Sequence, residues 1–502
     1  MNTERALHHY GKLGYLALSL VLIALNVHFS IHERWIADFW VFVGLLQEIS
    51  KNPLHPGNPF IVGVPPNIPY MPYLLGVSFF GEAFQLSFEQ ALAILGVINL
   101  SLFLYFFRKF LLPLLGGEFA VFLSLCAVLL LWGSHPWLVS GFFHLRTLFY
   151  VTPYPSTFAI ALSFICFSLY LSFQAKQQWK SFVLLFALSI TIALTHPLSF
   201  LFTAGGLLAL TVRKFQLHNW ESYLPILVVL ALSLGAAAVW PYFPLFTAVS
   251  DATYAADPGT VVLYYRVLPR IWPALIGLPF LLYRLKRDIR DPFVWMFIGF
   301  AGLYSYGIAR ESWSYGRIIA SAVMVLQIVL ASATSEFISF ILRWTREATT
   351  KIVLPTIIVA MMAITIVTYR YGYGEKSNET AKKYSFLERF TERDEVVLAT
   401  QETSLFPPVF GRKVVVYPRP SFVGPSYEER VNDIQHFFEL QSSRDMRREI
   451  LKKYQVEYVL ITEDHLTGEM SLPRSVATEL GEILFENNEA LLIQIPSAER
   501  KP

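Results

Sequence analysis

The sequence contains little charge: 15% of its 502 residues are Asp, Glu, Lys or Arg, against about 25% in soluble domains. More than half of the residues, 54%, are hydrophobic, and the mean hydropathy is +0.47. In a chain of this length, that composition excludes a water-soluble enzyme and a disordered protein. The net charge of +3 is also too small for a typical nucleic-acid-binding protein. We therefore expect a protein that crosses a membrane several times.

Cysteine is nearly absent as well. Cys126 and Cys166 are the two cysteines, and both lie inside apolar runs. They provide neither a disulfide framework nor a metal cluster. The C-terminal part also lacks a glycine-rich phosphate loop after a strand and a nucleophile elbow. It therefore shows no sign of a second catalytic centre of those kinds.

The charge that is present is unevenly distributed. Residues 1–369 contain 22 Lys and Arg against 15 Asp and Glu, whereas residues 370–502 contain 18 against 22. The second part has the composition of an ordinary soluble domain and is long enough to bury a core. The sequence thus predicts a transmembrane module over residues 1–370 and a soluble α/β domain over residues 371–502.

Eleven apolar segments are long enough, or nearly so, to cross a bilayer as helices. They are 13–30, 86–107, 110–132, 154–175, 181–195, 197–213, 222–244, 268–284, 292–309, 317–342 and 351–369. The first lacks a small-residue cleavage site, so we interpret it as an uncleaved span rather than a signal peptide.

The loop charges predict the orientation. With the N-terminus in the cytosol, fifteen Lys and Arg residues of the first 369 face the cytosol and seven face the other side. An odd number of spans then places the C-terminal domain outside the cytosol. We expect a multi-pass protein of the cell (plasma) membrane, with long outer loops at 31–85, 133–153 and 245–267.

The first outer loop carries a suggestive carboxylate. Residues 35–50 show a helical pattern, and Asp38 lies in it with Val41 and Phe42 at the following turn. A carboxylate among apolar side chains beside a membrane is costly unless it is paired or functional. Arg34, four residues earlier, is an equally simple partner, so a structural ion pair stays open.

Several motifs together resemble one family, the GT-C superfamily of polytopic glycosyltransferases, which use polyprenyl-phosphate-linked sugars. They are an Asp after the first span, Asn52-Pro53-Leu54-His55-Pro56, Tyr154-Pro155-Ser156-Thr157-Phe158-Ala159, His196-Pro197, and Phe410-Gly411-Arg412-Lys413-Val414-Val415 in the tail. The resemblance covers the whole architecture and is closest to uncharacterised prokaryotic members.

The resemblance implies an inverting glycosyltransferase that moves a sugar from a polyprenyl-phosphate donor to a glycan, lipid or protein acceptor outside the cytosol. In that family an acidic residue of the first outer loop is the general base, and by position this is Asp38. The metal-dependent branch uses closely spaced acidic pairs, but here Glu33 and Asp38 are five residues apart and the outer loops contain no Asp-x-Asp. We therefore expect a reaction without a metal cofactor.

A lipid-phosphate leaving group requires cationic donors, and arginine matches its oxygens best. Arg310 and Arg317 bracket a short outer loop, and Arg146 lies in an otherwise apolar one. All three are candidate phosphate ligands. The alternatives are a surface ion pair of either loop arginine with Glu311, and a snorkelling Arg146.

The remaining candidate substrate contacts are Glu33, His55, His196, Asp251, Trp313 and Tyr315. Both histidines stand beside proline, where a histidine usually caps a helix or bonds the core. Trp313 and Tyr315 also suit the membrane interface as anchors. Asp251 lies in a loop that the resemblance associates with donor binding.

The tail domain shows short apolar strand patterns at 394–399, 413–417 and 456–462, a helical pattern over 428–454, and a hairpin formed by 483–485 and 490–495. We interpret it as an acceptor-recognition or capping domain. Two other function classes stay open for the whole chain: a non-catalytic scaffold or assembly subunit with this fold, and a transporter of lipid-linked substrates.

Overall fold

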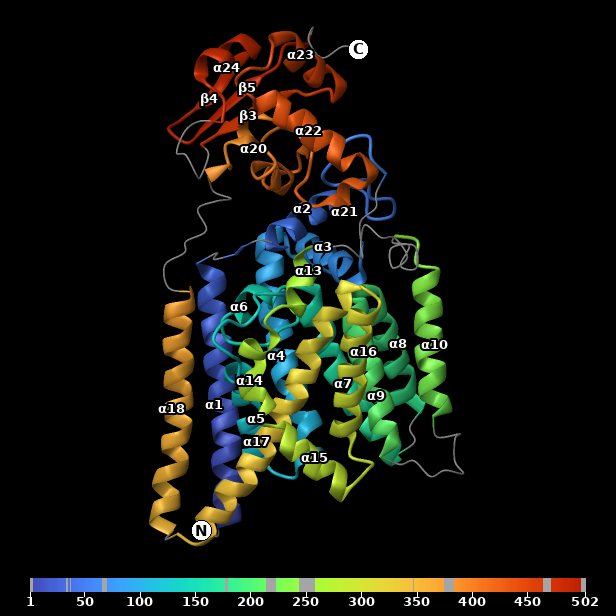
Figure 1. Cartoon of the computed structure of the whole chain (residues 1–502), viewed down its shortest axis with the longest axis vertical. Coiled ribbons are helices and arrows are strands. Elements are labelled where there is room, and N and C mark those ends of the chain that lie inside the picture. Colours follow the sequence, from blue (N-terminus) through green and yellow to red (C-terminus); the bar gives the residue numbers. More distant parts are fainter. Residues whose placement is uncertain are drawn as a thin grey trace. The chain divides into compact units, whose positions relative to one another are not determined.

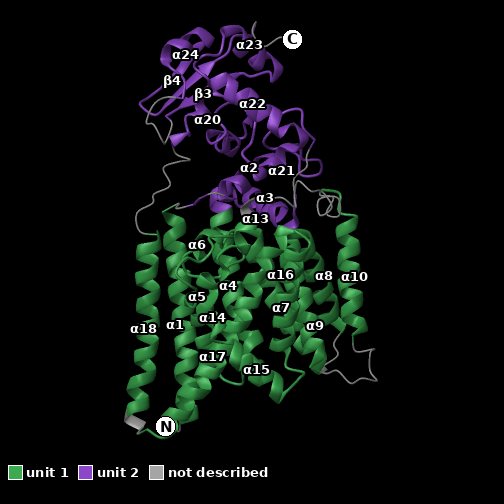
Figure 2. Ribbon diagram, in the orientation of Figure 1, with its two compact units in different colours: residues 1–34, 92–376 green, residues 35–91, 377–502 purple. Residues whose placement is uncertain are grey.

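The computed structural model describes residues 3–32, 35–36, 38–65, 70–176, 179–213, 223–242, 258–345, 347–373, 383–463 and 471–497. The chain forms two compact units (Figure 2). Unit 1 comprises residues 1–34 and 92–376, and unit 2 comprises residues 35–91 and 377–502. The first outer loop therefore folds together with the tail domain, rather than with the helices that precede and follow it.

Unit 1 is helical (Figure 1). Its elements are α1 (Thr3–Ile31), α4 (Phe88–Leu115, whose first residues belong to unit 2), α5 (Glu118–Leu130), α6 (Leu148–Val151), α7 (Pro155–Lys176), α8 (Trp179–Thr195), α9 (Pro197–Val212), α10 (Leu224–Ala238), α13 (Pro258–Val261), η2 (Val262–Tyr264), α14 (Val267–Leu275), α15 (Leu278–Arg287), α16 (Pro292–Ala309), η3 (Trp313–Ile318), α17 (Ile319–Arg343) and α18 (Glu347–Tyr373). Every one of the predicted spans corresponds to one or two of these helices.

The helices have the length and composition of a multi-pass membrane protein. Six stretches among the described residues are long and apolar enough to cross a bilayer, and α5, α8, α9 and α10 are shorter apolar helices. In the most apolar part of Trp313–Arg343, 72% of the residues are buried, against 22% in that of Thr349–Tyr373. Accordingly α17 packs against α5, α14, α15 and α16, whereas α18 packs mainly on α1. The core of unit 1 thus surrounds α17.

The boundary predicted between the second and third spans is wrong. Helix α4 continues to Leu115, and the turn falls at Gly116, whose φ of +71° favours glycine. Arg108 therefore lies inside α4, where it forms an ion pair and a 3.0 Å hydrogen bond with the buried carboxylate of Glu118. That pairing lets both charges remain within the apolar hairpin.

The eighth predicted span is not one helix but two, α14 and α15. The break falls at Gly277, where an added β-carbon would lie 2.3 Å from the carbonyl oxygen of Leu326 in α17. Only glycine permits so close an approach of the two backbones. After the break, Arg284 in α15 binds Asp291, the N-cap of α16, at 2.6 Å.

Unit 2 contains a five-stranded mixed sheet. Its strands are β1 (Val396–Leu398), β2 (Lys413–Val414), β3 (Tyr458–Thr462), β4 (Glu482–Glu486) and β5 (Ala490–Gln494), in the order β2-β1-β3-β5-β4. The first three strands are parallel, and β5 is antiparallel to both β3 and β4. The predicted strands and hairpin are confirmed.

The helical elements of unit 2 are α2 (Asp38–Lys51), α3 (Pro72–Phe84), α20 (Leu387–Phe390), η4 (Thr403–Leu405), η5 (Pro407–Phe410), α21 (Pro420–Val423), η6 (Gly424–Ser426), α22 (Tyr427–Phe438), α23 (Arg444–Lys453) and α24 (Arg474–Leu480). The single helix predicted over 428–454 is wrong. It divides into α22 and α23 because Ser443 caps a new helix, its hydroxyl accepting from the Met446 amide at 3.2 Å.

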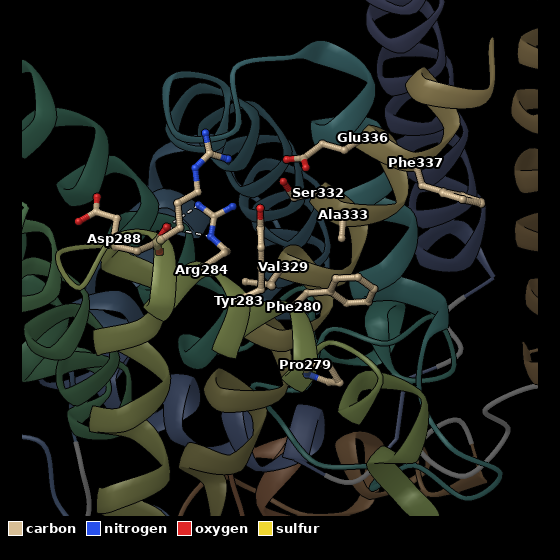
Figure 3. A pocket seen from close by; sticks show the side chains of 12 residues that line it. Pro279, Phe280, Tyr283, Arg284, Asp288, Val329, Ser332, Ala333, Glu336 and Phe337 are labelled. Carbon is tan, nitrogen blue, oxygen red and sulfur yellow. Dashed lines mark hydrogen bonds and ion pairs between the residues drawn. The ribbon is translucent and has the colours of Figure 1, made fainter. Parts of the chain in front are cut away.

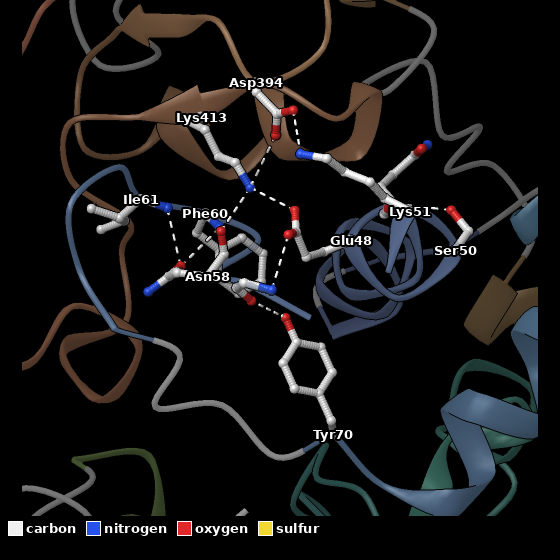
Figure 4. Close-up of polar contacts among 11 residues, drawn as sticks. Glu48, Ser50, Lys51, Asn58, Phe60, Ile61, Tyr70, Asp394 and Lys413 are labelled. Carbon is white, nitrogen blue, oxygen red and sulfur yellow. Dashed lines mark hydrogen bonds and ion pairs between the residues drawn. The ribbon is translucent and has the colours of Figure 1, made fainter. Parts of the chain in front are cut away.

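The first outer loop is joined to the sheet by a buried ion pair (Figure 4). Glu48 of α2 contacts Lys413 of β2 at 2.8 Å, and both residues are over 90% buried. The Lys413 ammonium also donates to the Asn58 carbonyl at 2.7 Å, while Glu48 accepts from the Gly57 amide at 3.0 Å. Each charge is therefore satisfied by several hydrogen bonds, which offset the cost of its burial.

Backbone pairing extends this attachment. The Val414 amide donates to the Phe60 carbonyl at 2.7 Å, and Ile61 forms a parallel bridge with Val414. The Asn58 side chain organises this short segment, since its carboxamide oxygen accepts from the amides of Phe60 and Ile61 (Figure 4). The loop thus adds a strand-like edge beside β2.

We expect Lys413→Met to destabilise unit 2 by about 3–5 kcal/mol, because it leaves the Glu48 carboxylate buried without its counter-ion. Thermal unfolding of the purified protein in detergent measures the change. The double variant Glu48→Gln/Lys413→Met removes both charges and keeps an acceptor for Gly57, so it is expected to regain at least half of the loss. An unchanged melting temperature for Lys413→Met would show that the pair is not needed.

Candidate functional site

Asp38 is the first residue of α2 and remains accessible. Its side chain is 33% exposed and forms an ion pair with Arg419, which is 41% exposed and directly precedes α21. The next residues anchor the helix: Phe39 is fully buried and stacks on Trp35 at 4.4 Å. Asp38 is therefore fixed at the N-terminus of a packed helix, where a negative charge is favoured. Its predicted structural partner, Arg34, lies outside the described residues.

Tyr417 completes the surroundings of this pair. Its ring stacks on Phe60 at 3.9 Å, and its buried hydroxyl has no hydrogen-bond partner in the described part of the chain. Burial raises the pKa of Tyr417, the nearby Arg419 charge lowers it, and Asp38 raises it. The phenol is therefore neutral near pH 7, and it offers an unused donor close to the carboxylate and the guanidinium.

A second ion pair, between Lys51 and Asp394, lies near the opposite end of α2 (Figure 4). Burial alone would raise the pKa of Asp394, but the hydrogen bond from Lys51 and the charge of Lys413 outweigh it and lower the pKa. The same hydrogen bond raises the pKa of Lys51. This pair is structural in our interpretation, because Glu48 and Lys413 beside it join α2 to the sheet.

In unit 1, residues 133–147 form an ordered outer loop around His144. The His144 ring bonds the Trp137 carbonyl at 2.9 Å, and the Tyr373 hydroxyl donates to the Leu145 carbonyl at 2.7 Å. The Gly133 amide donates to the carbonyl of Arg270 at 2.7 Å. These bonds hold the loop backbone in place without using the exposed arginine side chains.

Three arginines contact this loop. Arg146 donates to the Ser134 carbonyl at 3.2 Å, and Arg270 donates to the His135 carbonyl at 3.0 Å while lying over the Trp137 ring. Arg317 donates to the Ser140 hydroxyl at 3.1 Å. The structure therefore brings two of the predicted phosphate ligands, Arg146 and Arg317, to one loop together with Arg270. Because Ser134 and His135 are adjacent in the chain, the side chains of Arg146 and Arg270 lie close together.

Arg310 behaves differently. It ends α16, is exposed, and its side chain has no ion pair or hydrogen bond among the described residues. Glu311 pairs with neither Arg310 nor Arg317 within the described ranges, so the proposed surface ion pair does not form. Trp313 packs edge-on against Tyr264 at 5.4 Å, and Tyr315 against Tyr306 at 5.5 Å. Both rings are half-buried, which leaves part of each face accessible.

The predicted histidines adopt the simpler role. His196 is the N-cap of α9: its ring accepts from the Ser199 amide at 3.2 Å and bonds the Ser199 hydroxyl at 2.9 Å. It also interacts electrostatically with Arg317. His55 is exposed, and its backbone amide donates to the side chain of Asn52 at 3.2 Å. Glu33 and Asp251 lie outside the described residues.

A cavity of about 660 Å³ in unit 1 is lined by none of the predicted site residues (Figure 3). Its walls come from α15 and α17 and include Arg284, Glu336 and Phe337. The loop charges predict that this end of the helices faces the cytosol, which is the side opposite to that of the expected reaction.

The described residues contain no group of three or more His, Cys, Asp or Glu side chains arranged to hold a metal ion. Because Glu33, the acid nearest to Asp38 in sequence, lies outside those residues, metal independence stays a prediction.

The fold is similar to that of two solved membrane proteins. The oligosaccharyltransferase of Archaeoglobus fulgidus, solved in complex with zinc and sulfate, has a TM-score of 0.56 and 13% identity over 89% of this chain and 67% of its own. ArnT from Cupriavidus metallidurans, in the apo state, has a TM-score of 0.58 and 12% identity over 98% of this chain and 99% of its own. No family model and no curated protein matches the chain. The similarity covers most of this chain and confirms the predicted fold class, a polytopic helical membrane protein with a C-terminal domain.

Sequence reasoning missed Arg419 and Tyr417 beside Asp38 in unit 2, and Arg270 beside the 133–147 loop in unit 1. Tyr417 and Arg419 stand in the segment Tyr417-Pro418-Arg419-Pro420, which begins three residues after the end of β2. An arginine between two prolines at the end of a strand is a signal that could have been used, since prolines fix the backbone that presents it. Arg270 offers no such signal, because its contacts are with His135 and Trp137, which are distant in the sequence.

The lowered pKa of Asp394 makes its stabilising effect depend on pH. Because the folded-state pKa lies below the unfolded one, the contribution is present above the ordinary pKa and is lost as the pH falls through the lowered value. We expect Asp394→Asn to lower the free energy of unfolding at pH 7 by less than about 1 kcal/mol, because the ion pair is partly exposed. Its melting temperature should therefore lie slightly below that of the parent. The difference should shrink below about pH 4.

The matched control is Asp445→Asn, which alters an exposed acid in the first turn of α23. It should show no such pH-dependent difference from the parent. A gap between Asp394→Asn and the parent that is constant from pH 7 to pH 3 would contradict the assignment.

Proposed function

We propose that the chain is an integral-membrane, inverting glycosyltransferase that moves a sugar from a polyprenyl-phosphate donor to a glycan, lipid or protein acceptor outside the cytosol. The main support is the accessible carboxylate of Asp38 at the start of α2, in the first outer loop of a protein with the GT-C fold. A general base must be reachable by the acceptor hydroxyl, and a one-third exposed side chain on a fixed helix meets that requirement.

In the proposed reaction, the acceptor hydroxyl attacks the anomeric carbon of the donor sugar. Asp38 takes the hydroxyl proton as the new carbon–oxygen bond forms. The bond from the anomeric carbon to the phosphate oxygen breaks on the opposite face, and polyprenyl phosphate leaves with the electron pair. A single displacement of this kind inverts the configuration at the anomeric carbon.

Arg419 holds Asp38 in place before the reaction. While the two are paired, the Arg419 guanidinium occupies a position at the Asp38 carboxylate that an acceptor hydroxyl would need. We propose that Arg419 releases Asp38 when substrate binds and then contacts the substrate. The unpartnered Tyr417 hydroxyl is available to donate to Asp38 or to the acceptor at that stage.

The arginines of unit 1 supply the charge for the leaving group. We propose Arg317, Arg146 and Arg310 as phosphate ligands, with Arg270 beside Arg146. The support is that Arg146 and Arg317 each donate from Nη1 to the 133–147 loop, while Arg310 is exposed. A guanidinium has five N–H donors, so each can bind a phosphate oxygen without losing its loop contact.

A non-catalytic scaffold role has one observation in its favour. The Asp38–Arg419 ion pair joins α2 to the segment before α21, and a purely structural pair would look the same. The two functions differ in what happens when the carboxylate is replaced by an amide of the same shape.

We expect Asp38→Asn to reduce sugar transfer at least about 10²-fold, the lower range for loss of general base catalysis, with a melting temperature close to that of the parent. Transfer is measured as release of polyprenyl phosphate from a panel of polyprenyl-phosphate hexoses and pentoses. Asp445→Asn is the control for the same chemical change at an exposed acid. Undiminished turnover by Asp38→Asn rules out the proposed base, and a parent that turns over no donor while Asp38→Asn unfolds early supports the scaffold.

We expect Arg317→Gln to lower kcat/KM for the lipid-linked donor about 10- to 100-fold, since one charge-assisted hydrogen bond to phosphate is lost. Arg317→Lys keeps the positive charge but lacks the planar guanidinium, so its kcat/KM should lie between those of the parent and of Arg317→Gln. Arg343→Gln changes an exposed arginine at the predicted cytosolic side and should act like the parent. Equal kcat/KM for Arg317→Gln and Arg343→Gln would exclude Arg317 from the phosphate site.

A further inference from the structure

A crevice lies at the carboxyl ends of two parallel strands of unit 2. Strands β1 and β3 are adjacent and in register, with Leu398 opposite Val459. Residues Thr400–Thr403 after β1, Thr462 at the end of β3, Glu463 after it, and Ser471 line a cavity of about 280 Å³ together with residues of α22. In α/β folds, ligands bind outside the carboxyl ends of parallel strands. The volume is close to the lower limit for small-molecule sites, about 300 Å³.

Part of the lining is already arranged by internal hydrogen bonds. The Thr403 and Thr462 hydroxyls, from the ends of the two strands, are 2.9 Å apart, and the Thr400 hydroxyl donates to Thr403 at 3.1 Å. The Gln401 carboxamide donates to the Tyr427 hydroxyl at 2.6 Å. These contacts fix the cavity wall before any ligand binds, which lowers the entropic cost of binding.

Other polar groups of the lining are not used by the fold. The side chains of Glu402, Gln435 and Glu463 have no hydrogen-bond or ion-pair partner among the described residues. The Ser471 hydroxyl is buried and also has none in the described part of the chain. Ser471 is held there by its own amide, which donates to the Thr462 carbonyl at 2.9 Å. Because Ser471 lines the cavity, its hydroxyl can donate to or accept from a ligand atom there.

The chemistry of the lining selects the ligand class. It contains two carboxylates, two carboxamides and several hydroxyls but no Lys, Arg or His, so it disfavours phosphates and uronic acids. Carboxylates accept from sugar hydroxyls or an amino group, and carboxamides both donate and accept. The half-buried Phe438 and Val431 provide an apolar surface for the C–H face of a sugar ring.

We infer that this crevice binds a neutral or amino-bearing sugar residue, with Glu402, Gln435, Glu463 and Ser471 as its hydrogen-bonding groups. The binding of a sugar in the crevice is inferred from the lining alone. The further statement, that this sugar is a part of the acceptor away from the bond being formed, rests on the proposed function. On this basis the acceptor is a glycan, and the tail domain selects it.

The test uses the full-length protein in nanodiscs and saturation-transfer difference NMR. The probes are di- and trisaccharides of mannose, galactose and N-acetylglucosamine, chitosan trimer as the amino sugar, and digalacturonate and glucose 6-phosphate as anions. We expect signals from at least one neutral or amino-bearing probe and none from the anions. No signal from any neutral or amino probe at 10 mM, on the order of the weakest useful affinities, would overturn the inference, as would binding of the anions alone.

Variants locate the site. Gln435→Ala is expected to weaken saccharide binding at least about tenfold, a loss of about 1.4 kcal/mol, whereas Gln441→Ala, at an exposed position outside the cavity, leaves it unchanged. Ser471→Ala should weaken binding while the melting temperature stays the same or rises, because it removes a hydroxyl that the fold does not satisfy. Binding unaffected by Gln435→Ala and by Ser471→Ala places the sugar elsewhere and refutes the site.

Asp38→Asn separates this inference from the proposed function. It should retain saccharide binding while transfer is lost. Retained transfer with retained binding would refute the catalytic role of Asp38 and leave the saccharide site standing. Loss of saccharide binding in a folded Asp38→Asn protein would instead place the sugar at Asp38 and refute the crevice.

Discussion

The arrangement of unit 2 depends on the buried contact between Glu48 and Lys413. One charge comes from the first outer loop and the other from a strand of the tail domain, and the two residues are 365 positions apart in the chain. Since an isolated buried charge is very costly, neither segment can separate from the other without exposing or stranding its charge. Asp38, at the other end of the same helix, inherits its position from this contact. The ion pair with Arg419 is a consequence of α2 being held against the tail.

The two kinds of polar site in this chain differ in how rigidly they are built. Around Glu48 and Lys413, every charged atom has protein partners, which is typical of a structural network. At Tyr417 and Ser471, by contrast, buried hydroxyls lack partners among the described residues. Similar hydroxyls occur elsewhere in the described residues, for example at Ser78 and Ser189. What distinguishes Tyr417 and Ser471 is their position, near the Asp38 carboxylate and in the lining of the crevice.

The sequence predicts the helices of the membrane part well, because apolar length is a local property. The helices α7, α9 and α16 begin and end within a few residues of the predicted spans, and α1 begins earlier than predicted, at Thr3. The errors at Gly116 and Gly277 have different causes. Gly116-Gly117 is a local turn signal that could have been used, whereas the break at Gly277 is set by the approach of Leu326, which no local pattern reveals.

For the candidate site, residue type and loop position make Asp38, Arg146 and Arg317 candidates, and their roles stay predictions. It does not identify Arg419, because the partner of Asp38 is chosen by how α2 packs on the tail rather than by helical spacing. The boundary between the parts of the chain is also a tertiary property: residues 35–91 have a composition that suits either unit, and only their contacts assign them to the sheet.

The edge that Phe60 and Ile61 add beside β2 has a consequence for biosynthesis. A ribosome adding about 5–20 residues per second needs roughly 20–70 s to proceed from Glu48 to Lys413. During that interval the acid and the strand-like segment are synthesised but have nothing to pair with. Glu48 and the segment around Phe60 must stay hydrated or be bound by a chaperone until the last quarter of the chain emerges. The first outer loop can therefore complete its folding only after the C-terminal domain has been synthesised.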